Sequence, residues 1–181
     1  VTRTFFHLLY QKLYTKLESI REKQVLPKTK RLIAISGQVA EELHSGLGTK
    51  IPPISIVHHG SDVVEKGKIE NKGNAKKNLG LDPDVPLIIF VGAMERKGID
   101  KALRILALSN ETSWNFVVLG RGQIEKWQSV AINAGLGERI KFVGFQKVEP
   151  YWSAADILLF PSTYEPFGLV VSEAASYGVL P

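Results

Sequence analysis

The stretch ILLFPSTYEPFGLVVSEAASY, residues 157–177, gives the clearest indication of the fold. Residues 157–160 are a short apolar run, and Pro161 and Ser162 close it as buried strands are usually closed. Small and apolar residues recur at helical spacing from Leu169 onward. The stretch therefore predicts a strand, a loop and a helix.

Two carboxylates stand eight residues apart in this stretch. Glu165 is expected on the loop at the carboxyl end of the strand, and Glu173 in the first turns of the helix. Open α/β sheets bind ligands at the carboxyl ends of their strands, and the N–H groups at a helix start attract anions. The arrangement suits a ligand with hydroxyl groups at both ends and phosphate between them, such as a nucleoside diphosphate sugar.

The segment EPFGLVVSE, which follows LFPSTY, resembles the E-x7-E signature of retaining glycosyltransferases of family 4, which have the GT-B fold of two Rossmann-like domains. The resemblance implies that Glu165 contacts the donor sugar and that Glu173 binds the ribose hydroxyls. It also implies that the backbone of Phe167, Gly168 and Leu169 approaches the sugar and the phosphate. The alternative is an ordinary exposed helix with a cap.

The composition limits the classes of function. The 181 residues suffice for one core or for one and a half domains, and no apolar run is long enough to span a membrane. Cysteine is absent, which excludes disulfides and thiolate chemistry and is compatible with a cytoplasmic protein. The net charge of +5 comes mostly from residues 1–62, without the dense basic patch that nucleic-acid binding requires. We therefore expect no nucleic-acid partner.

Residues 3–24 predict an amphipathic helix that Pro27 ends. Its apolar positions are Phe6, Leu9, Leu13, Leu17 and Ile20. One interpretation is a surface helix that faces a core. The other is a basic helix lying on an anionic membrane, which would place the protein peripherally at the cytoplasmic membrane face.

Residues 31–36 predict a strand, residues 38–44 a short helix and residues 54–62 a strand with a turn. This order resembles the end of the acceptor domain in the same family, although His59 stands where the family turn usually has Asn. His58 and His59 could be metal ligands or a base, but adjacent strand residues point to opposite faces, so structural or hinge roles are expected.

The chain is expected to contain parts of two domains. Residues 1–62 would be the end of an N-terminal acceptor domain, residues 63–85 a linker with a short helix, and residues 86–181 most of a C-terminal Rossmann-like domain. Within the linker segment, the sequence 82–84 (Asp-Pro-Asp) superficially resembles a D-x-D metal motif. Its central proline predicts a turn instead.

From residue 86 onward, strands and helices alternate. The expected strands are 87–91, 116–119 and 140–143, and the expected helices are 99–108, 124–134 and 150–155. This alternation predicts an α/β fold of the GT-B type, in which helices cover both faces of a Rossmann-like parallel sheet.

The first strand end carries GAMERKG, residues 92–98. We expect Arg96 and Lys97 in a loop there, where cations would meet a diphosphate, although a solvated cap is the simpler alternative. The segment resembles the family's G-R-x-x-x-x-K-G donor loop, which implies that Gly92 contacts the donor and that Lys97 binds its diphosphate. Ala93 replaces the family arginine, and Arg96 could substitute for it.

The next two strand ends also carry glycine. Gly120 could let the backbone approach a ligand closely, but a plain turn explains it nearly as well. Gly144 and Phe145 resemble the loop in which family members hold the nucleobase, largely through main-chain atoms.

The resemblance implies that a hexose moves, with retention, from a nucleotide-diphosphate sugar to a hydroxyl of a glycan, lipopolysaccharide or lipid-linked acceptor. Arg96, Lys97 and Glu165 would be the catalytic groups, and no metal or cofactor would be needed. A glycoside hydrolase with two carboxylates, a non-catalytic nucleotide-sugar-binding module, and an epimerase or phosphorylase of the GT-B fold are the alternatives. Since the chain holds only parts of two domains, we expect it to be inactive alone.

Overall fold

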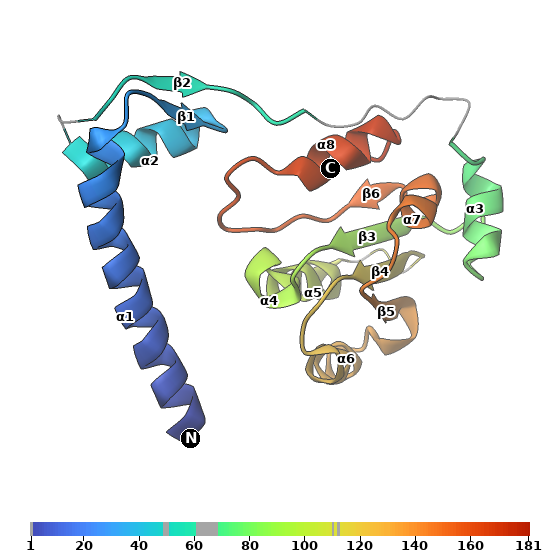
Figure 1. The fold of residues 1–181 in the computed structure, drawn as a ribbon. Helices are drawn as coiled ribbons and strands as arrows, with labels where there is room; N and C mark the ends of the chain where they lie inside the picture. Colours follow the sequence, from blue (N-terminus) through green and yellow to red (C-terminus); the bar gives the residue numbers. More distant parts are fainter. Residues whose placement is uncertain (1, 49–50, 61–68, 110, 112) are drawn as a thin grey trace. The chain divides into compact units, whose positions relative to one another are not determined.

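A computed structural model describes residues 2–48, 51–60, 69–109, 111 and 113–181 (Figure 1). The chain forms two compact units, Val1–His59 and Gly60–Pro181. Residues 61–68, which hold the end of the turn expected at 54–62 and the start of the linker expected at 63–85, lie outside the described residues.

The first unit contains two helices and two short parallel strands. These are α1 (Thr2–Val25), β1 (Leu32–Ala34), α2 (Gly37–Leu47) and β2 (Ile54–Ile56), with a short 3₁₀ helix, η1 (Leu26–Lys28), after α1. Pro27 lies in η1, where the chain leaves α1 as predicted. Ser36 caps α2, because its hydroxyl accepts a hydrogen bond from the N–H of Val39 at 3.2 Å.

The apolar side of α1 is exposed. Leu9, Leu13 and Leu17 are 53 to 57% exposed, so the expected packing of this side against a core is not found among the described residues. In the part of the chain that the structure describes, no helix is both long and apolar enough to cross a membrane.

The second unit is built on a four-stranded parallel sheet with the order β5-β4-β3-β6 (Figure 1). The strands are β3 (Leu87–Val91), β4 (Asn115–Leu119), β5 (Ile140–Gly144) and β6 (Ile157–Leu158). The helices are α3 (Lys72–Asn78), α4 (Met94–Lys97), α5 (Ile99–Leu108), α6 (Ile124–Asn133), α7 (Glu149–Ala154) and α8 (Leu169–Ser176), with a 3₁₀ turn, η4 (Gly137–Arg139), before β5. The predicted α/β fold class with a parallel sheet is confirmed.

Alternate residues of the strands enter two different hydrophobic cores. Phe116 and Val118 of β4 pack with buried residues of α5 and α6, whereas Val117 and Leu119 pack with residues of α7 and α8. Because successive side chains of a strand point to opposite faces, helices cover both faces of the sheet.

Two local expectations were wrong. The segment expected as a loop after β3 contains a short helix, α4, which begins as soon as the chain leaves the sheet. The strand expected at residues 157–160 is paired only over Ile157 and Leu158. Leu159 still donates to the carbonyl of Ile89 at 2.8 Å, but the chain then leaves the sheet before Pro161, which has no N–H to donate.

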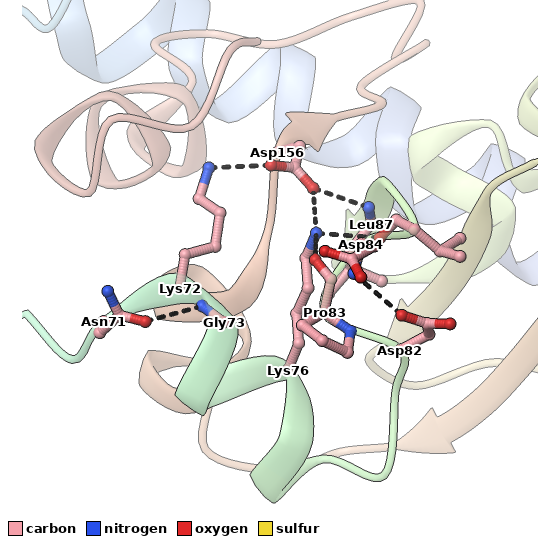
Figure 2. Close-up of polar contacts among 10 residues, drawn as sticks. Asn71, Lys72, Gly73, Lys76, Asp82, Pro83, Asp84, Leu87 and Asp156 are labelled. Carbon is pink, nitrogen blue, oxygen red and sulfur yellow. Dashed lines mark hydrogen bonds and ion pairs between the residues drawn. The ribbon is translucent and has the colours of Figure 1, made fainter.

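A polar network at the amino ends of the strands fixes α3 to the sheet (Figure 2). Asp156, just before β6, pairs with Lys76 at 2.8 Å and with Lys72 at 2.9 Å, and it accepts from the N–H of Leu87 at 2.8 Å. Burial alone would raise the pKa of the Asp156 carboxyl, but these hydrogen bonds outweigh burial and hold that pKa below its ordinary value. The carboxylate is therefore a structural anchor.

The Asp82-Pro83-Asp84 segment forms the predicted turn. The side chain of Asp82 accepts from the N–H of Asp84 at 2.9 Å, as aspartate does in an Asx turn. The carbonyl of Pro83 accepts from Lys76, so the turn also belongs to the amino-end network (Figure 2).

Candidate active site

The strand ends of β3, β4 and β5 are packed against one another through glycine. Gly92 donates to the carbonyl of Leu119 at 2.9 Å, and Gly120 donates to the carbonyl of Gly144 at 2.8 Å. Gly120 has a φ of 129°, and a Cβ atom there would collide with the carbonyl oxygen of Gly92. The glycine at position 120 is therefore required by the neighbouring backbone, whatever it contributes to a ligand.

A cavity of about 790 Å³ opens at these three strand ends, within the usual range of small-molecule sites. Its lining residues are Val91, Gly92, Ala93, Leu119, Gly120, Arg121, Phe145, Gln146, Lys147, Val148 and Glu149. Three predicted donor-binding residues, Gly92, Gly120 and Phe145, are among them. The Phe145 ring is 74% exposed, and the Arg121 guanidinium lies 4.8 Å from its centroid.

The two predicted cations differ in exposure because they lie on a helical turn rather than in a loop. Lys97 is 8% exposed, whereas Arg96 is exposed. The Lys97 stem packs beside Gly92, where a Cβ atom would lie 3.0 Å from Cγ of the lysine. The ammonium lies 5.1 Å from the centroid of the Phe160 ring. Both cations lie at the strand end where the motif predicts them, but the motif does not indicate which of them is buried.

Lys97 forms an ion pair with Glu165, so two of the predicted catalytic residues are in contact although 68 positions separate them. Burial lowers the pKa of the Lys97 ammonium, and the nearby charge of Arg96 lowers it further. The loop that carries Glu165 lies against the start of α5. A Cβ atom on Gly98 would lie 2.8 Å from the carbonyl oxygen of Pro161, and Lys101 donates to the hydroxyl of Thr163.

The segment after Glu165 enters α8 through Gly168, which has a φ of 80° and is buried. Phe167 precedes it and Leu169 is the first residue of α8, as the sequence predicts. Glu173 follows one turn later and is half-buried. Burial raises the pKa of the Glu173 carboxyl, and the negative charge of Glu149 raises it further.

Two carboxylates of this region were missed by the sequence analysis. Glu149 lines the cavity from the start of α7 and is close enough to influence Glu173. Glu95 of α4 accepts hydrogen bonds from Gln123, the N-cap of α6, and from Trp127 inside α6. Only the position of Glu95 inside GAMERKG, next to the predicted cations, offered a signal for it.

The site divides into two parts. Lys97, the last residue of α4, and Glu165 form a charged pair, while the cavity extends from Gly92 to the loop after Gly144. His58 and His59 follow β2 in the other unit. Among the described residues, no three side chains suitable as metal ligands gather at one point.

Residues 71–181 match the family described as Glycosyl transferases group 1, and this match covers more than half of the chain. The protein belongs to this family.

Two relatives illustrate the similarity in sequence. The chain is 31% identical over 175 residues to D-inositol 3-phosphate glycosyltransferase 2 of Catenulispora acidiphila, covering 88% of this chain and 41% of the relative. It is 32% identical over 168 residues to the lipopolysaccharide core biosynthesis mannosyltransferase LpsB of Rhizobium meliloti, covering 87% of this chain and 46% of the relative. The chain thus spans less than half the length of these relatives.

The fold is shared with solved glycosyltransferase structures. The crystal structure of Anabaena HepE in complex with UDP-glucose superposes with a TM-score of 0.75 at 20% identity, covering 93% of this chain and 49% of that protein. This likeness confirms the GT-B type of fold expected from the sequence.

Proposed function

We propose that the protein is a retaining glycosyltransferase that moves a hexose from a nucleotide-diphosphate sugar to a hydroxyl of a glycan, lipopolysaccharide or lipid-linked acceptor. The observation that carries this proposal is the Lys97–Glu165 pair, which lies at the carboxyl ends of the strands in a member of the Glycosyl transferases group 1 family. A buried cation and a carboxylate in contact supply one group for the diphosphate and one for the sugar.

Lys97 would bind the donor diphosphate, and Arg96 would add a second, more exposed charge. As the bond to the sugar breaks, negative charge grows on the departing nucleoside diphosphate, and cations held in place stabilise that charge. A nucleoside diphosphate neutralised in this way leaves without a proton or a metal, so we propose that no metal or cofactor takes part.

The remaining predicted residues would hold the rest of the donor. Glu165 would contact the sugar, while the backbone of Phe167, Gly168 and Leu169 would approach the sugar and phosphate. Gly92 and Gly120 line the cavity where the nucleotide would lie, and Glu173 would accept from the ribose hydroxyls.

The nucleobase would lie at the far end of the cavity, against the loop of Gly144 and Phe145. The HepE structure was obtained with UDP-glucose, which makes a UDP sugar the first donor to test. LpsB is named a mannosyltransferase, so the sugar could differ from glucose, and GDP and ADP sugars complete the series of donors.

The ion pair also favours transfer over hydrolysis as the proposed reaction. A glycoside hydrolase needs two carboxyl groups that flank the bond to be broken, one of them able to give a proton. Glu165 is held by the buried Lys97 instead, which suits contact with the donor better than proton transfer to a leaving group.

A thermal-shift series with UDP, GDP and ADP sugars on the full-length protein tests donor binding. A donor at about a hundred times its Kd should stabilise the protein by roughly 2.7 kcal/mol. NMR of the product with a suitable acceptor would then show whether the anomeric configuration is retained. Stabilisation without transfer would indicate a binding module, a requirement for free phosphate would indicate a phosphorylase, and inversion would contradict the proposed mechanism.

We further propose that the predicted donor residues suffice for weak nucleotide binding by the 181-residue chain alone, without transfer. Ligand-observed NMR with UDP and GDP would detect such binding. Transfer by this chain alone would contradict the assignment of the acceptor site to the other domain. We propose a cytoplasmic location, with the basic helix α1 able to contact the membrane, and sedimentation with anionic lipid vesicles would test that contact.

A further inference from the structure

Glu95 connects α4, which follows β3, to the start of α6, which follows β4. Its carboxylate oxygen Oε1 accepts from the backbone N–H of Gln123 at 3.0 Å and from the indole Nε1–H of Trp127, also at 3.0 Å. These partners lie 28 and 32 positions away in the sequence. The carboxylate therefore joins two segments that are distant from each other in the sequence.

One of the two partners of Glu95 is buried. Trp127 is 8% exposed and belongs to the same hydrophobic core as Met94, the first residue of α4. The N–H of Met94 donates to the carbonyl of Arg121 at 2.9 Å, and a Cβ atom on Gly122 would lie 2.7 Å from Cβ of Met94. The loop after β4 and the first turn of α6 thus pack closely against α4 and can support its orientation.

The helix α4 needs such a support. It has only four residues, too few for a helix that is stable by itself, and Ala93 at its N-cap makes no side-chain hydrogen bond to it. Its orientation must come from tertiary contacts. Glu95 provides two of them, one residue before Arg96 and two before Lys97.

The hydrogen bonds favour the charged form of Glu95. The N–H of Gln123 makes the largest contribution to lowering the pKa of this carboxyl, and Trp127 adds to it against the opposing effect of burial. Hydrogen bonds to an ionised acceptor are stronger than those between neutral groups.

We propose that Glu95 is a positioning residue for the donor: through Gln123 and Trp127 it orients α4, so that Lys97 and Arg96 meet the diphosphate. This inference rests on the proposed function. Glu95 itself touches neither donor nor acceptor, so its loss should act on diphosphate binding and leave acceptor binding unchanged.

The test uses the full-length protein with Glu95→Ala and Glu95→Gln, with inorganic pyrophosphate as the probe in calorimetry. Glu95→Ala should weaken pyrophosphate binding and raise the KM for the donor by about ten-fold, because small misplacements of binding groups carry large kinetic costs. The KM for the acceptor should not change. Glu95→Gln keeps an oxygen acceptor in place and should restore binding to within about three-fold of the parent protein.

The matched control is Glu125→Ala. Glu125 is an exposed glutamate on the first turn of α6, and its side chain makes no hydrogen bond or ion pair among the described residues, so its removal should leave pyrophosphate binding unchanged. Trp127→Phe removes the indole donor while keeping an aromatic ring, and it should weaken pyrophosphate binding by about half as much as Glu95→Ala on a logarithmic scale.

The outcomes separate this inference from the proposed function. If the parent protein binds neither pyrophosphate nor any nucleotide sugar, the proposed function fails. If the parent binds and Glu95→Ala binds equally well, Glu95 positions nothing and the inference is overturned. A loss that glutamine does not restore, or one in which acceptor KM and thermal midpoint change in step with donor KM, would indicate a purely structural role and would also overturn it.

Discussion

Two buried lysines lie at opposite ends of the same parallel sheet, and their surroundings differ. At the amino end, the ammonium of Lys76 lies 2.8 Å from Asp156, 2.9 Å from the carbonyl of Val85 and 3.3 Å from the carbonyl of Pro83 (Figure 2). At the carboxyl end, Lys97 pairs with Glu165 alone among the described residues and lies near the face of an aromatic ring.

The two ammonium groups differ in how many of their N–H donors have an acceptor among the described residues. An ammonium group has three N–H donors, and at Lys76 three acceptors from the protein match them. At Lys97 one carboxylate accepts, burial disfavours the charge, and phosphate oxygens would supply the missing acceptors. A buried lysine with all its donors used is structural, whereas one with donors left over is suited to a ligand.

Breaking the amino-end cluster should have the largest effect, on stability. Asp156→Ala removes the partner of two lysines and of the Leu87 N–H, so the free energy of unfolding should fall by about 2 to 3 kcal/mol. Chemical denaturation would measure this loss, and kcat per folded molecule should stay near that of the parent. The control is Asp84→Ala, which removes an exposed carboxylate from the nearby turn at residues 82–84.

The same cluster should make the protein sensitive to acid. Because the pKa of Asp156 is lowered in the folded state, its contribution to stability is complete above the unfolded pKa and is lost as the pH falls through the folded pKa. Denaturation at a series of acidic pH values should show a weaker pH dependence for Asp156→Asn than for the parent. Parallel curves would show that Asp156 contributes nothing to acid stability.

Breaking the carboxyl-end pair should instead reduce activity. Lys97→Ala should lower kcat/KM of the full-length enzyme about a hundred-fold, or about 2.7 kcal/mol, because a charge-assisted contact with the diphosphate is lost. Arg96→Ala should cost about ten-fold, since its exposed charge is screened by solvent. Steady-state kinetics would measure both, with the exposed Lys77→Ala as the control. Unchanged kinetics in Lys97→Ala would remove this residue from the mechanism.

The role of Glu173 can be tested with a modified donor. A 2′-deoxyribose donor should bind about ten-fold more weakly to the parent, since a hydrogen bond to a charged group is lost. In Glu173→Ala, the normal and 2′-deoxy donors should bind equally. If both proteins discriminate to the same extent, the ribose lies elsewhere.

The smallest expected effect is a shift in pH dependence. Glu173 accepts hydrogen bonds best as a carboxylate, so donor binding should weaken as the pH falls through its raised pKa. Glu149→Gln removes the nearby negative charge, lowers the pKa of Glu173 and should move the acidic limb of donor binding to lower pH. Donor affinity measured against pH would check this shift. If the acidic limb lies at the same pH in Glu149→Gln and in the parent, the two carboxylates are not coupled.

Local sequence patterns were sufficient for most elements of the second unit. The apolar run at residues 87–91 predicted β3, and the helix predicted at 99–108 is α5, in which Ile99, Ala102, Leu103 and Leu106 are buried. The strand β3 follows from a continuous apolar run and the helix α5 from a period of 3.6 residues, and the sequence displays both directly. The helix α4 was missed because four residues are too few to display a period.

The site was predicted as a set of residues but not as an arrangement. The motifs placed Lys97, Arg96 and Glu165 at strand ends that a parallel sheet brings to one edge, and Glu173 in the helix that follows. They could not show that Lys97 is buried while Arg96 is exposed, because that depends on the rotation of about 100° between neighbouring residues on a helical turn.

The sequence by itself therefore determined the α/β class, the order of the elements and the residue types at the strand ends, since each depends on neighbours within a few positions. Only the tertiary structure decided which charges meet. The contacts of Lys97 with Glu165 and of Glu95 with Trp127 join residues 68 and 32 positions apart. Such contacts arise when parallel strands bring their following loops together, and no local pattern encodes them.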